Sequence, residues 1–413
     1  MGAVLICAAD PHAGGNNPGD TDSWALCGGG FQEFGSNAAR SAITWRTAGT
    51  FSVLSIQVLV AETVNVTVKL NIAGSDGTIT VTLTASTTGL FQDLSNTDAV
   101  SAGNLVNMVL SKTGGVGSVR WSMSVAFTAT TGHVTYHGST ISTANLSGTN
   151  TYYNKLAGSL GAQTVESLHQ IRMDVAGTAA KLQCYVIANS KLSTVTIGTR
   201  KNTAPGGQAI AVLTTQTGLF EDTTGTDSLD GNDDFNFSET TLDTATFTVS
   251  FVACQFTSSA TNNHVMCAAA GGSAISNSLT RYETIGGIYG NNPTPTNAGT
   301  KLRHGFTVDV TRLSIYVTAF TLATAASATV TLFKNGVDGN NVLTVTGTGL
   351  TQDTTNTDSF TATDDINIEI DTTPATVGGF TASWLSIVET VAAAAATGAI
   401  PYSRRARNYY LAR

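Results

Sequence analysis

Apolar and polar residues alternate along many short stretches of this 413-residue chain. The clearest examples are LSIQVLV from Leu54, LQCYVIA from Leu182 and LSIYVTA from Leu313. An apolar residue at every second position indicates a strand with one face in a core. No stretch has a convincing helical period, and glycine and asparagine punctuate the short runs. The pattern therefore predicts an all-β chain of short antiparallel strands.

One phrase stands at three places in the chain. It reads TGLFQDLSNTD at 88–98, TGLFEDTTGTD at 217–227 and TGLTQDTTNTD at 348–358. Its glycines Gly89, Gly218 and Gly349 are 129 and 131 residues apart. Solenoid repeats are only about 20 to 50 residues long, so each period here is a whole domain.

Further landmarks place the limits of the repeats. An aromatic residue, an arginine and a hairpin asparagine recur in each copy: Trp24, Tyr153 and Tyr282; Arg46, Arg172 and Arg303; Asn71, Asn202 and Asn335. We expect repeats at 1–131, 132–262 and 263–396, followed by an arm at 397–413. About eight strands in about 130 residues favour a jelly roll over an immunoglobulin-like sandwich. The predicted fold is three tandem antiparallel β-sandwich (jelly-roll) domains with a C-terminal extension.

Charge separates the arm from the rest of the chain. The formal net charge is −8, and only 12% of residues are charged, so we expect no nucleic-acid partner. Arg404, Arg405, Arg407 and Arg413 give the arm a charge of +4, which leaves 16 basic against 28 acidic residues elsewhere. The amino-terminal sequence lacks the basic start of a secretory signal, and no run is long enough for a membrane span. We expect synthesis in a cytoplasm and no membrane partner.

The order of motifs within each repeat resembles a known module. A hairpin, an alternating strand, the phrase TGxFxDTTNTDS, an acidic or Gly-Asn turn and a last strand resemble the jelly-roll module of tailed-bacteriophage virion structural proteins of the decoration, collar or fibre type. The resemblance runs from the arginine strand to the last strand of each repeat. It implies a non-enzymatic protein on the outside of a particle, made in the host cytoplasm and located in the virion, without a cofactor. Its implied partners are other virion subunits, as a homo-oligomer or bound to a lattice.

Acidic residues of the shared phrase are candidate calcium ligands. They are Asp93, Asp98, Asp222, Asp227, Asp353 and Asp358. Carboxylates in a loop rich in Ser, Thr and Asn are suitable ligands for calcium, although this spacing is not that of an EF-hand. The favoured interpretation is that they accept hydrogen bonds from nearby backbone amides and fix a turn.

The five cysteines are an odd number, so at least one is unpaired within the chain. Cys184 aligns with Ile56 and Ile315, and Cys254 aligns with Val125 and Leu385, so both are expected in the core. Cys27, in a glycine-rich loop, is a candidate for a disulfide to another subunit in an oxidising environment. No pair has a zinc spacing. His133 and His264 are expected at equivalent positions near strand edges.

The arm is the candidate interaction segment. Arg404, Arg405 and Arg407 are suited to pair with carboxylates of a neighbouring subunit, while Tyr409 and Tyr410 fill a pocket. A solvated, disordered terminus is the alternative.

No nucleophile elbow, phosphate loop or metalloprotease motif occurs, so no catalytic residue is assigned. We expect a structural virion protein, either head decoration and cement or neck collar. The alternative is a carbohydrate- or receptor-binding module of a fibre or adhesin. Its aromatic candidates are Tyr152, Tyr153, Tyr282 and Tyr289.

Overall fold

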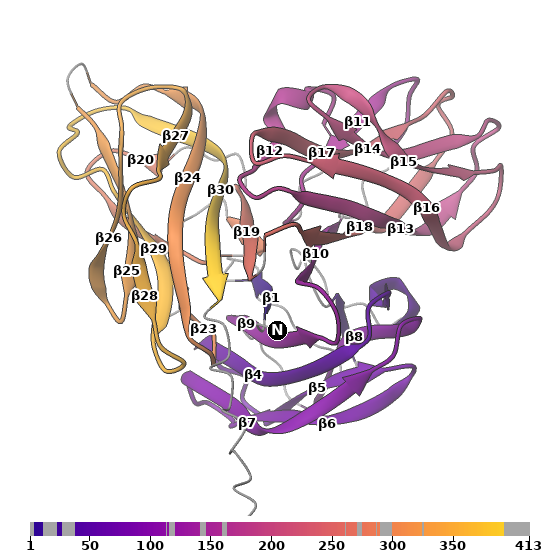
Figure 1. The fold of residues 1–413 in the computed structure, drawn as a ribbon. Coiled ribbons are helices and arrows are strands. Elements are labelled where there is room, and N and C mark those ends of the chain that lie inside the picture. Colours follow the sequence, from indigo (N-terminus) through magenta and orange to yellow (C-terminus); the bar gives the residue numbers. More distant parts are fainter. Residues whose placement is uncertain are drawn as a thin grey trace, which may run out of the picture.

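The computed structural model describes residues 4–10, 23–26, 38–112, 114, 120–140, 146–158, 163–260, 262–270, 275–285, 287–289, 300–323 and 326–391. In these ranges the chain forms three β-sandwiches that lie around a common centre (Figure 1). Helical structure in the described ranges is limited to two 3-10 turns, η1 (Ala38–Ser41) and η2 (Glu166–Leu168). A helix long and apolar enough to cross a membrane is not found among these residues.

The first sandwich, indigo to purple in Figure 1, has two antiparallel sheets. One has the strand order β1-β9-β4-β7, and the other has the order β2-β8-β5-β6 with β3 added beside β8. We call the first of these the inner sheet and the second the outer sheet. The strands are β1 (Val4–Asp10), β2 (Ser23–Leu26), β3 (Ile43–Trp45), β4 (Gly49–Val60), β5 (Val66–Ile72), β6 (Ser75–Leu83), β7 (Gly89–Val100), β8 (Asn104–Lys112) and β9 (Arg120–Ala129).

The second sandwich repeats this order. Its inner sheet is β10-β18-β13-β16, and its outer sheet is β11-β17-β14-β15 with β12 beside β17. The strands are β10 (Val134–Thr140), β11 (Thr151–Asn154), β12 (Ile171–Met173), β13 (Gly177–Asn189), β14 (Val195–Lys201), β15 (Ala204–Val212), β16 (Gly218–Leu229), β17 (Asp233–Thr240) and β18 (Phe247–Ser258).

The third sandwich adds short strands to the same plan. Its inner sheet runs β22-β19-β30-β24-β27, with β20 beside β30 and β28 beside β24, and its outer sheet is β21-β29-β25-β26 with β23 beside β29. The strands are β19 (Asn263–Ala270), β20 (Ile275–Ser276), β21 (Thr280–Glu283), β22 (Gly287–Tyr289), β23 (Leu302–Arg303), β24 (Val308–Phe320), β25 (Ala328–Lys334), β26 (Val337–Val345), β27 (Gly349–Asp353), β28 (Asp358–Phe360), β29 (Asp365–Asp371) and β30 (Gly379–Val391).

This topology is that of a jelly roll. The first and last main strands of each sandwich are neighbours in the inner sheet, as β1 and β9 are, and the chain passes between the sheets several times. The predicted fold class, tandem antiparallel jelly-roll sandwiches, is confirmed. Because many paired strands are far apart in sequence, each core forms only when the whole repeat is in place.

The three alternating runs form the centres of β4, β13 and β24. In β4 the apolar members Leu54, Ile56 and Val58 are at most 1% exposed, as a strand with one face in the core requires. A bulge precedes each run, seen as a register shift between Ser52 and Leu54 in the first copy and at the equivalent places in β13 and β24. A bulge adds one residue and bends the strand, so it changes where the next side chains point.

Two predicted alignments need correction. The turn that joins β5 to β6 is centred on Ala73 (φ 53) and Gly74 (φ 80), so Ala73 and not Asn71 is the counterpart of Asn202 and Asn335. A turn with positive φ at both central residues favours Asn-Gly, and the first copy keeps only the glycine.

The second correction concerns a cysteine. Cys184 does match Ile56 and Ile315, but strand pairing matches Cys254 with Val125 and Ile387 rather than with Leu385. A shift of two residues leaves the same face of a strand in the core, so the alternating pattern alone does not detect it.

Candidate functional site

The six aspartates of the shared phrase join the two sheets of each sandwich. Asp98 of β7 accepts hydrogen bonds from the backbone N–H groups of Thr78 and Ile79 in β6, at 2.6 and 2.9 Å. Asp93 accepts one from the N–H of Thr80 at 2.9 Å. Strands β6 and β7 are edges of the outer and inner sheet, so the carboxylates satisfy N–H groups that an edge strand leaves unpaired.

The other sandwiches repeat these bonds. The N–H donors and their acceptors are Gly207 to Asp227 (2.5 Å), Ala209 to Asp222 (2.9 Å), Asn340 and Asn341 to Asp358 (2.7 and 2.8 Å) and Val342 to Asp353 (3.1 Å). A glycine makes the close approach possible, because a Cβ atom on Gly77 would lie 2.3 Å from an oxygen of Asp98. The repeated phrase therefore encodes a sheet-to-sheet fastening.

Hydrogen bonds lower the pKa of the first aspartate in each copy of the phrase. Burial raises the pKa of Asp93, but the N–H groups of Thr80, Asn96 and Ser95 outweigh burial and lower that pKa to about 2. The pKa of Asp353 is also about 2, for the same reasons. Among the residues that the structure describes, no group of three or more His, Cys, Asp or Glu side chains is placed to hold a metal ion. Calcium binding stays a prediction, which titration against melting temperature tests.

Two of the three recurring arginines, Arg46 and Arg303, contact a neighbouring sandwich. We call the contacts between sandwiches seam 1–2, seam 2–3 and seam 3–1. Arg46 forms an ion pair with Glu221 across seam 1–2. Arg303 donates to Gln92 across seam 3–1 at 3.4 Å, while it also pairs with Asp365 of its own sandwich at 2.6 Å. Glu221 and Gln92 occupy the same position of the shared phrase. The predicted equivalence of the three arginines is wrong, however, because Arg172 and Arg303 pair with Asp234 and Asp365, and the first sandwich has Thr44 paired with Leu105 in that place.

In the described part of the chain, seam 2–3 lacks such an arginine contact to the shared phrase. Arg172 bonds to Asp234 of its own sandwich at 2.7 Å instead of crossing. Gln352, at the position of Glu221 and Gln92 in the shared phrase, donates to Asp174 at 2.9 Å, and Asp174 also pairs with Arg312 of β24 at 2.9 Å. The ion pair across this seam therefore runs in the opposite sense, with the acid on the second sandwich.

Seam 1–2 is largely apolar and aromatic. The rings of Trp45 and Tyr136 stack with centroids 4.0 Å apart, and Phe251 of the second sandwich packs into the first core. The side chain of Gln183 exchanges two hydrogen bonds with the backbone of Thr44, at 2.8 and 3.1 Å. The backbone groups of Thr44 are satisfied in this exchange, whereas Oγ1 of Thr44, Nε1 of Trp45 and Nε of Arg46 are buried without a hydrogen-bond partner among the described residues.

Seam 3–1 is formed by polar groups. The hydroxyls of Ser122 and Ser124 donate to the backbone carbonyls of Lys301 and Arg303, at 2.6 and 3.0 Å. These partners are far apart in sequence and meet only because the three sandwiches close on one another. The three seams together make a closed pseudo-trimer from one chain.

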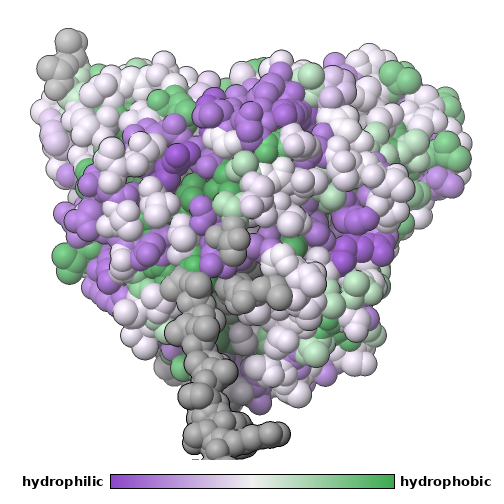
Figure 2. Space-filling view, in the orientation of Figure 1, coloured by the Kyte–Doolittle hydropathy of each residue, from purple (hydrophilic) through white to green (hydrophobic). Residues whose placement is uncertain are grey.

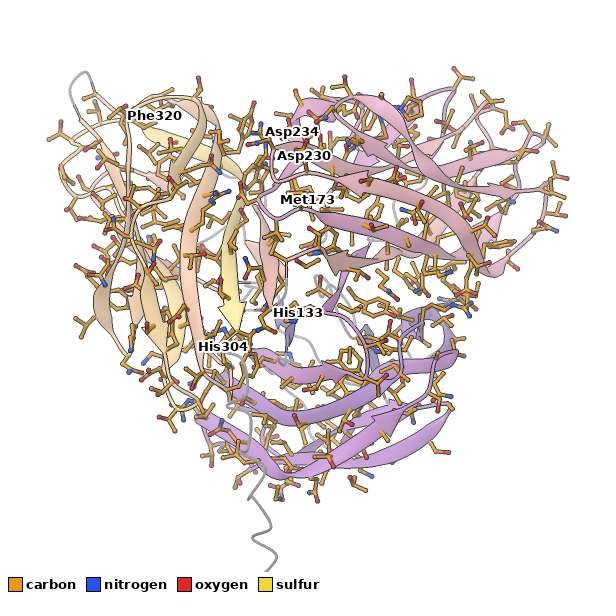
Figure 3. All side chains as sticks on the ribbon, viewed as in Figure 1. His133, Met173, Asp230, Asp234, His304 and Phe320 are labelled. Carbon is orange, nitrogen blue, oxygen red and sulfur yellow. The ribbon has the colours of Figure 1, made fainter. Side chains whose placement is uncertain are left out.

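Seam 2–3 contains most of the histidines in the described chain. Glu389 lies between His304, whose Nε2 is 2.6 Å from Oε1, and His264, whose Nε2 is 2.7 Å from Oε2. His133 Nε2 is 3.2 Å from His264 Nδ1. Burial raises the pKa of Glu389, but His304 and His264 outweigh burial and lower it to about 2. Figure 3 shows His133 and His304 near the place where the sandwiches meet.

The predicted equivalence of His133 and His264 was wrong. Thr135 pairs with Phe256 as His264 pairs with Glu389, so Thr135 takes the place of His264 in the second sandwich. His133 precedes β10 and reaches its contact from the connection between the first two sandwiches. Scattered single histidines gave no sequence signal for this cluster, because it is assembled from three separate segments.

Two of the cysteine predictions agree with the structure, since Cys184 and Cys254 are fully buried. Cys267 is also buried, and its Sγ lies 3.8 Å from Nδ1 of His137. This thiol–imidazole pair is not an activated nucleophile, because burial raises the pKa of Cys267 to about 12. Cys27 lies outside the described residues, and so does the whole arm with Arg404, Arg405, Arg407, Tyr409 and Tyr410.

The described tyrosine candidates are engaged within the protein. Tyr152 donates its hydroxyl to the carbonyl of Ser147 at 2.6 Å. Tyr153 lies under the guanidinium of Arg200, 5.5 Å from its ring centre. Tyr282 packs against Phe333, with centroids 5.5 Å apart. The side chain of Tyr289 is outside the described residues. Figure 2 likewise shows small, separate apolar patches on a mixed surface.

No model of a protein family matches the chain, and no curated protein matches it. Among solved structures, it is similar to one described as "The Triple Jelly Roll Fold and Turret Assembly in an Archaeal Virus". The two are 13% identical, and the match covers 85% of this chain and 81% of that chain with a TM-score of 0.20. Because the TM-score is so low, this similarity carries no conclusion about function.

Proposed function

We propose that this protein is a non-enzymatic structural component of a tailed-phage virion, displayed on the head or neck as decoration, cement or collar. The observation that carries the proposal is that three sandwiches of one topology lie around a common centre and contact one another, as Arg46 contacts Glu221 and Arg303 contacts Gln92. One chain thereby presents three similar outer faces around a pseudo-three-fold axis. A partner with its own three-fold repeat can engage all three faces at once.

Such an arrangement gives binding strength without a deep site. Each contact of a multivalent complex is weak alone, but the second and third form at high effective concentration. A bound subunit also stabilises its partner by mass action, in proportion to its occupancy. The resemblance of the repeated phrase to virion jelly-roll modules supports the same role. The partners are then other virion subunits, and the site of action is the virion.

Quantitative mass spectrometry of particles purified by density gradient tests the proposal. We expect many copies of the chain in each particle, and electron microscopy of particles lacking the chain should show intact heads that have lost surface or neck density. A chain that is abundant in the lysate but absent from banded particles would contradict the proposal. Specific hits on a glycan array would instead favour the receptor-binding alternative.

A further inference from the structure

The histidines of seam 2–3 form a continuous buried row. It runs from His304 to Glu389, then to His264 and finally to His133. The first three side chains are fully buried, and His133 is 5% exposed. His133 belongs to the segment that enters the second sandwich, whereas the other three belong to the third. Separation of the seam would therefore break the His133–His264 contact and expose both rings to water.

A second histidine contact crosses the same seam beside the first. His137 of β10 is 6% exposed, with Nδ1 3.8 Å from Sγ of Cys267 in β19 and Nε2 3.3 Å from Oγ1 of Thr135. The neighbouring thiol is a weak hydrogen-bonding group, and it is protonated because its pKa is raised by burial. No carboxylate contacts His137 in the described structure, so a positive charge on this ring has no paired anion.

The hydrogen bonds of the row determine which ring nitrogens carry a proton. When His264 directs Nε2–H toward Glu389, its Nδ1 accepts the Nε2–H of His133. His133 then has a bare Nδ1, which is buried and has no hydrogen-bond partner. Protonation of His133 places a charge and a new N–H donor at that atom. The closed seam therefore resists the proton that an exposed histidine accepts readily.

We propose that seam 2–3 is an acid-operated latch: it is closed at neutral pH, and protonation of His133 and His137 opens it below about pH 6 while the three sandwiches stay folded. The other seams do not share the property. Seam 1–2 is joined by an arginine–glutamate pair and an amide exchange, and seam 3–1 by hydroxyls and an arginine, and the residues named in these contacts do not include a histidine.

The direction of the effect follows from linkage. Burial is the largest cause that lowers the pKa of His133 to about 4, and burial also lowers the pKa of His137 to about 4. Both values lie below the ordinary 6.5, so the open state binds more protons between pH 6.5 and pH 4 and gains population as pH falls. Each histidine shifts the opening equilibrium about 30-fold between pH 7.5 and pH 5.

Protonation of Lys155 and His169, which are also buried near this seam, favours the open state as well. Burial lowers the pKa of Lys155 to about 7, and its Nζ donates to the carbonyl of Ser383 across the seam at 2.6 Å. His169 is buried beside Lys155, and its pKa is about 3. Glu389 opposes opening only above its own low pKa. The ion pair of Arg312 and Asp174 lies on the same seam.

Thiol labelling of the full chain tests the latch, with a dipyridyl disulfide reagent that reacts in acid as well as at neutral pH and with mass spectrometry to locate the label. Cys267 contacts His137 across seam 2–3, so we expect its labelling rate, relative to a free thiol, to rise at least tenfold between pH 7.5 and pH 5, reversibly. Cys184, which is buried in the core of the second sandwich, should stay unlabelled. Far-ultraviolet circular dichroism should stay unchanged over the same range.

A matched pair of variants separates the latch from general acid sensitivity. The double variant His133→Asn with His137→Gln cannot take up these protons, so its Cys267 should label no faster at pH 5 than at pH 7.5. Arg46→Met weakens seam 1–2 and should leave the acid midpoint of Cys267 labelling unchanged. Three results would overturn the proposal: an unchanged labelling rate of Cys267 in the wild type, loss of the β-sheet signal at the same midpoint, or acid labelling of Cys267 in the double variant at the wild-type pH. If the double variant fails to fold, the wild-type comparison of Cys267 with Cys184 decides alone.

Discussion

Seams 1–2 and 2–3 join the same kinds of sheet, yet they are built from different chemistry. Seam 1–2 buries Trp45 against Tyr136 and pairs the side-chain amide of Gln183 with the backbone of Thr44. Seam 2–3 packs Trp384 and Val388 of the third sandwich into the second core, but it also buries Glu389 among histidines. Three copies of one domain can therefore keep the same fold, while the interfaces between them differ in how strongly their stability depends on pH.

The aromatic contact should give the largest effect. Trp45 is fully buried and touches Phe51, Phe127 and Tyr136. We expect Trp45→Ala to lower the free energy of unfolding by about 3–5 kcal/mol, because it removes a large buried side chain and leaves a cavity. Urea denaturation measures the change, with Tyr136→Phe as a control that keeps the ring. A loss below about 1 kcal/mol would show that seam 1–2 is not packed as described.

The buried acid of seam 2–3 comes next. Glu389→Gln should cost about 3 kcal/mol at pH 7, because the buried rings of His264 and His304 lose the carboxylate that contacts both of them. The pKa of Glu389 is about 2, below its ordinary value of 4.5, so its contribution is complete above pH 4.5 and lost as pH falls toward 2. Denaturation midpoints at several pH values should therefore show a flatter acid limb in the variant. An identical limb in both proteins would contradict the assignment.

The aspartates that join the two sheets of each sandwich make their bonds within that sandwich, so their substitution serves as a reference for the effects at the seams. Asp98→Asn, Asp227→Asn and Asp358→Asn should each cost about 1–3 kcal/mol, since each change replaces an ionised acceptor of backbone N–H groups by a neutral amide. Thermal unfolding monitors the series. The three losses should agree within about 1 kcal/mol, and calcium should shift no midpoint. A single sandwich with a much larger loss would point to an additional role there.

The arginine pairs should give the smallest effect. Arg46→Met breaks a cross-seam pair whose side chains are 26% and 21% exposed, and it should cost about 1 kcal/mol. Arg172→Met breaks a pair inside one sandwich and should cost no more than Arg46→Met. The exchange Arg46→Glu with Glu221→Arg should recover part of the loss in a double-mutant cycle. No recovery would mean that the pair does not hold the seam.

Much of the fold could be predicted from the sequence. The period of two around Ile56, Cys184 and Ile315 places three strands on their cores, and the recurrence of Gly89 predicts three domains. Errors were confined to shifts of two residues, as for Cys254 and Asn71. Such shifts keep the same face of a strand buried, so hydrophobicity does not register them.

The candidate site was harder to predict. The aspartates recur, so their importance could be recognised, but their acceptance of N–H groups from β6, β15 and β26 depends on the meeting of two sheet edges. The cluster around Glu389 gave no signal at all, because His133, His264 and His304 come from three segments and have no counterpart in the other sandwiches. The copies differ at the interfaces between repeats, so a search for repeated residues does not detect the residues of these interfaces.

The most direct test of the closed arrangement is small-angle X-ray scattering of the full chain at neutral pH. Three sandwiches closed around a common centre should give a single compact particle, with a radius of gyration near the value of about 22 Å for a globular chain of this length. A radius well above that, with a distance distribution stretched along one axis, would show three sandwiches on a string and contradict the account.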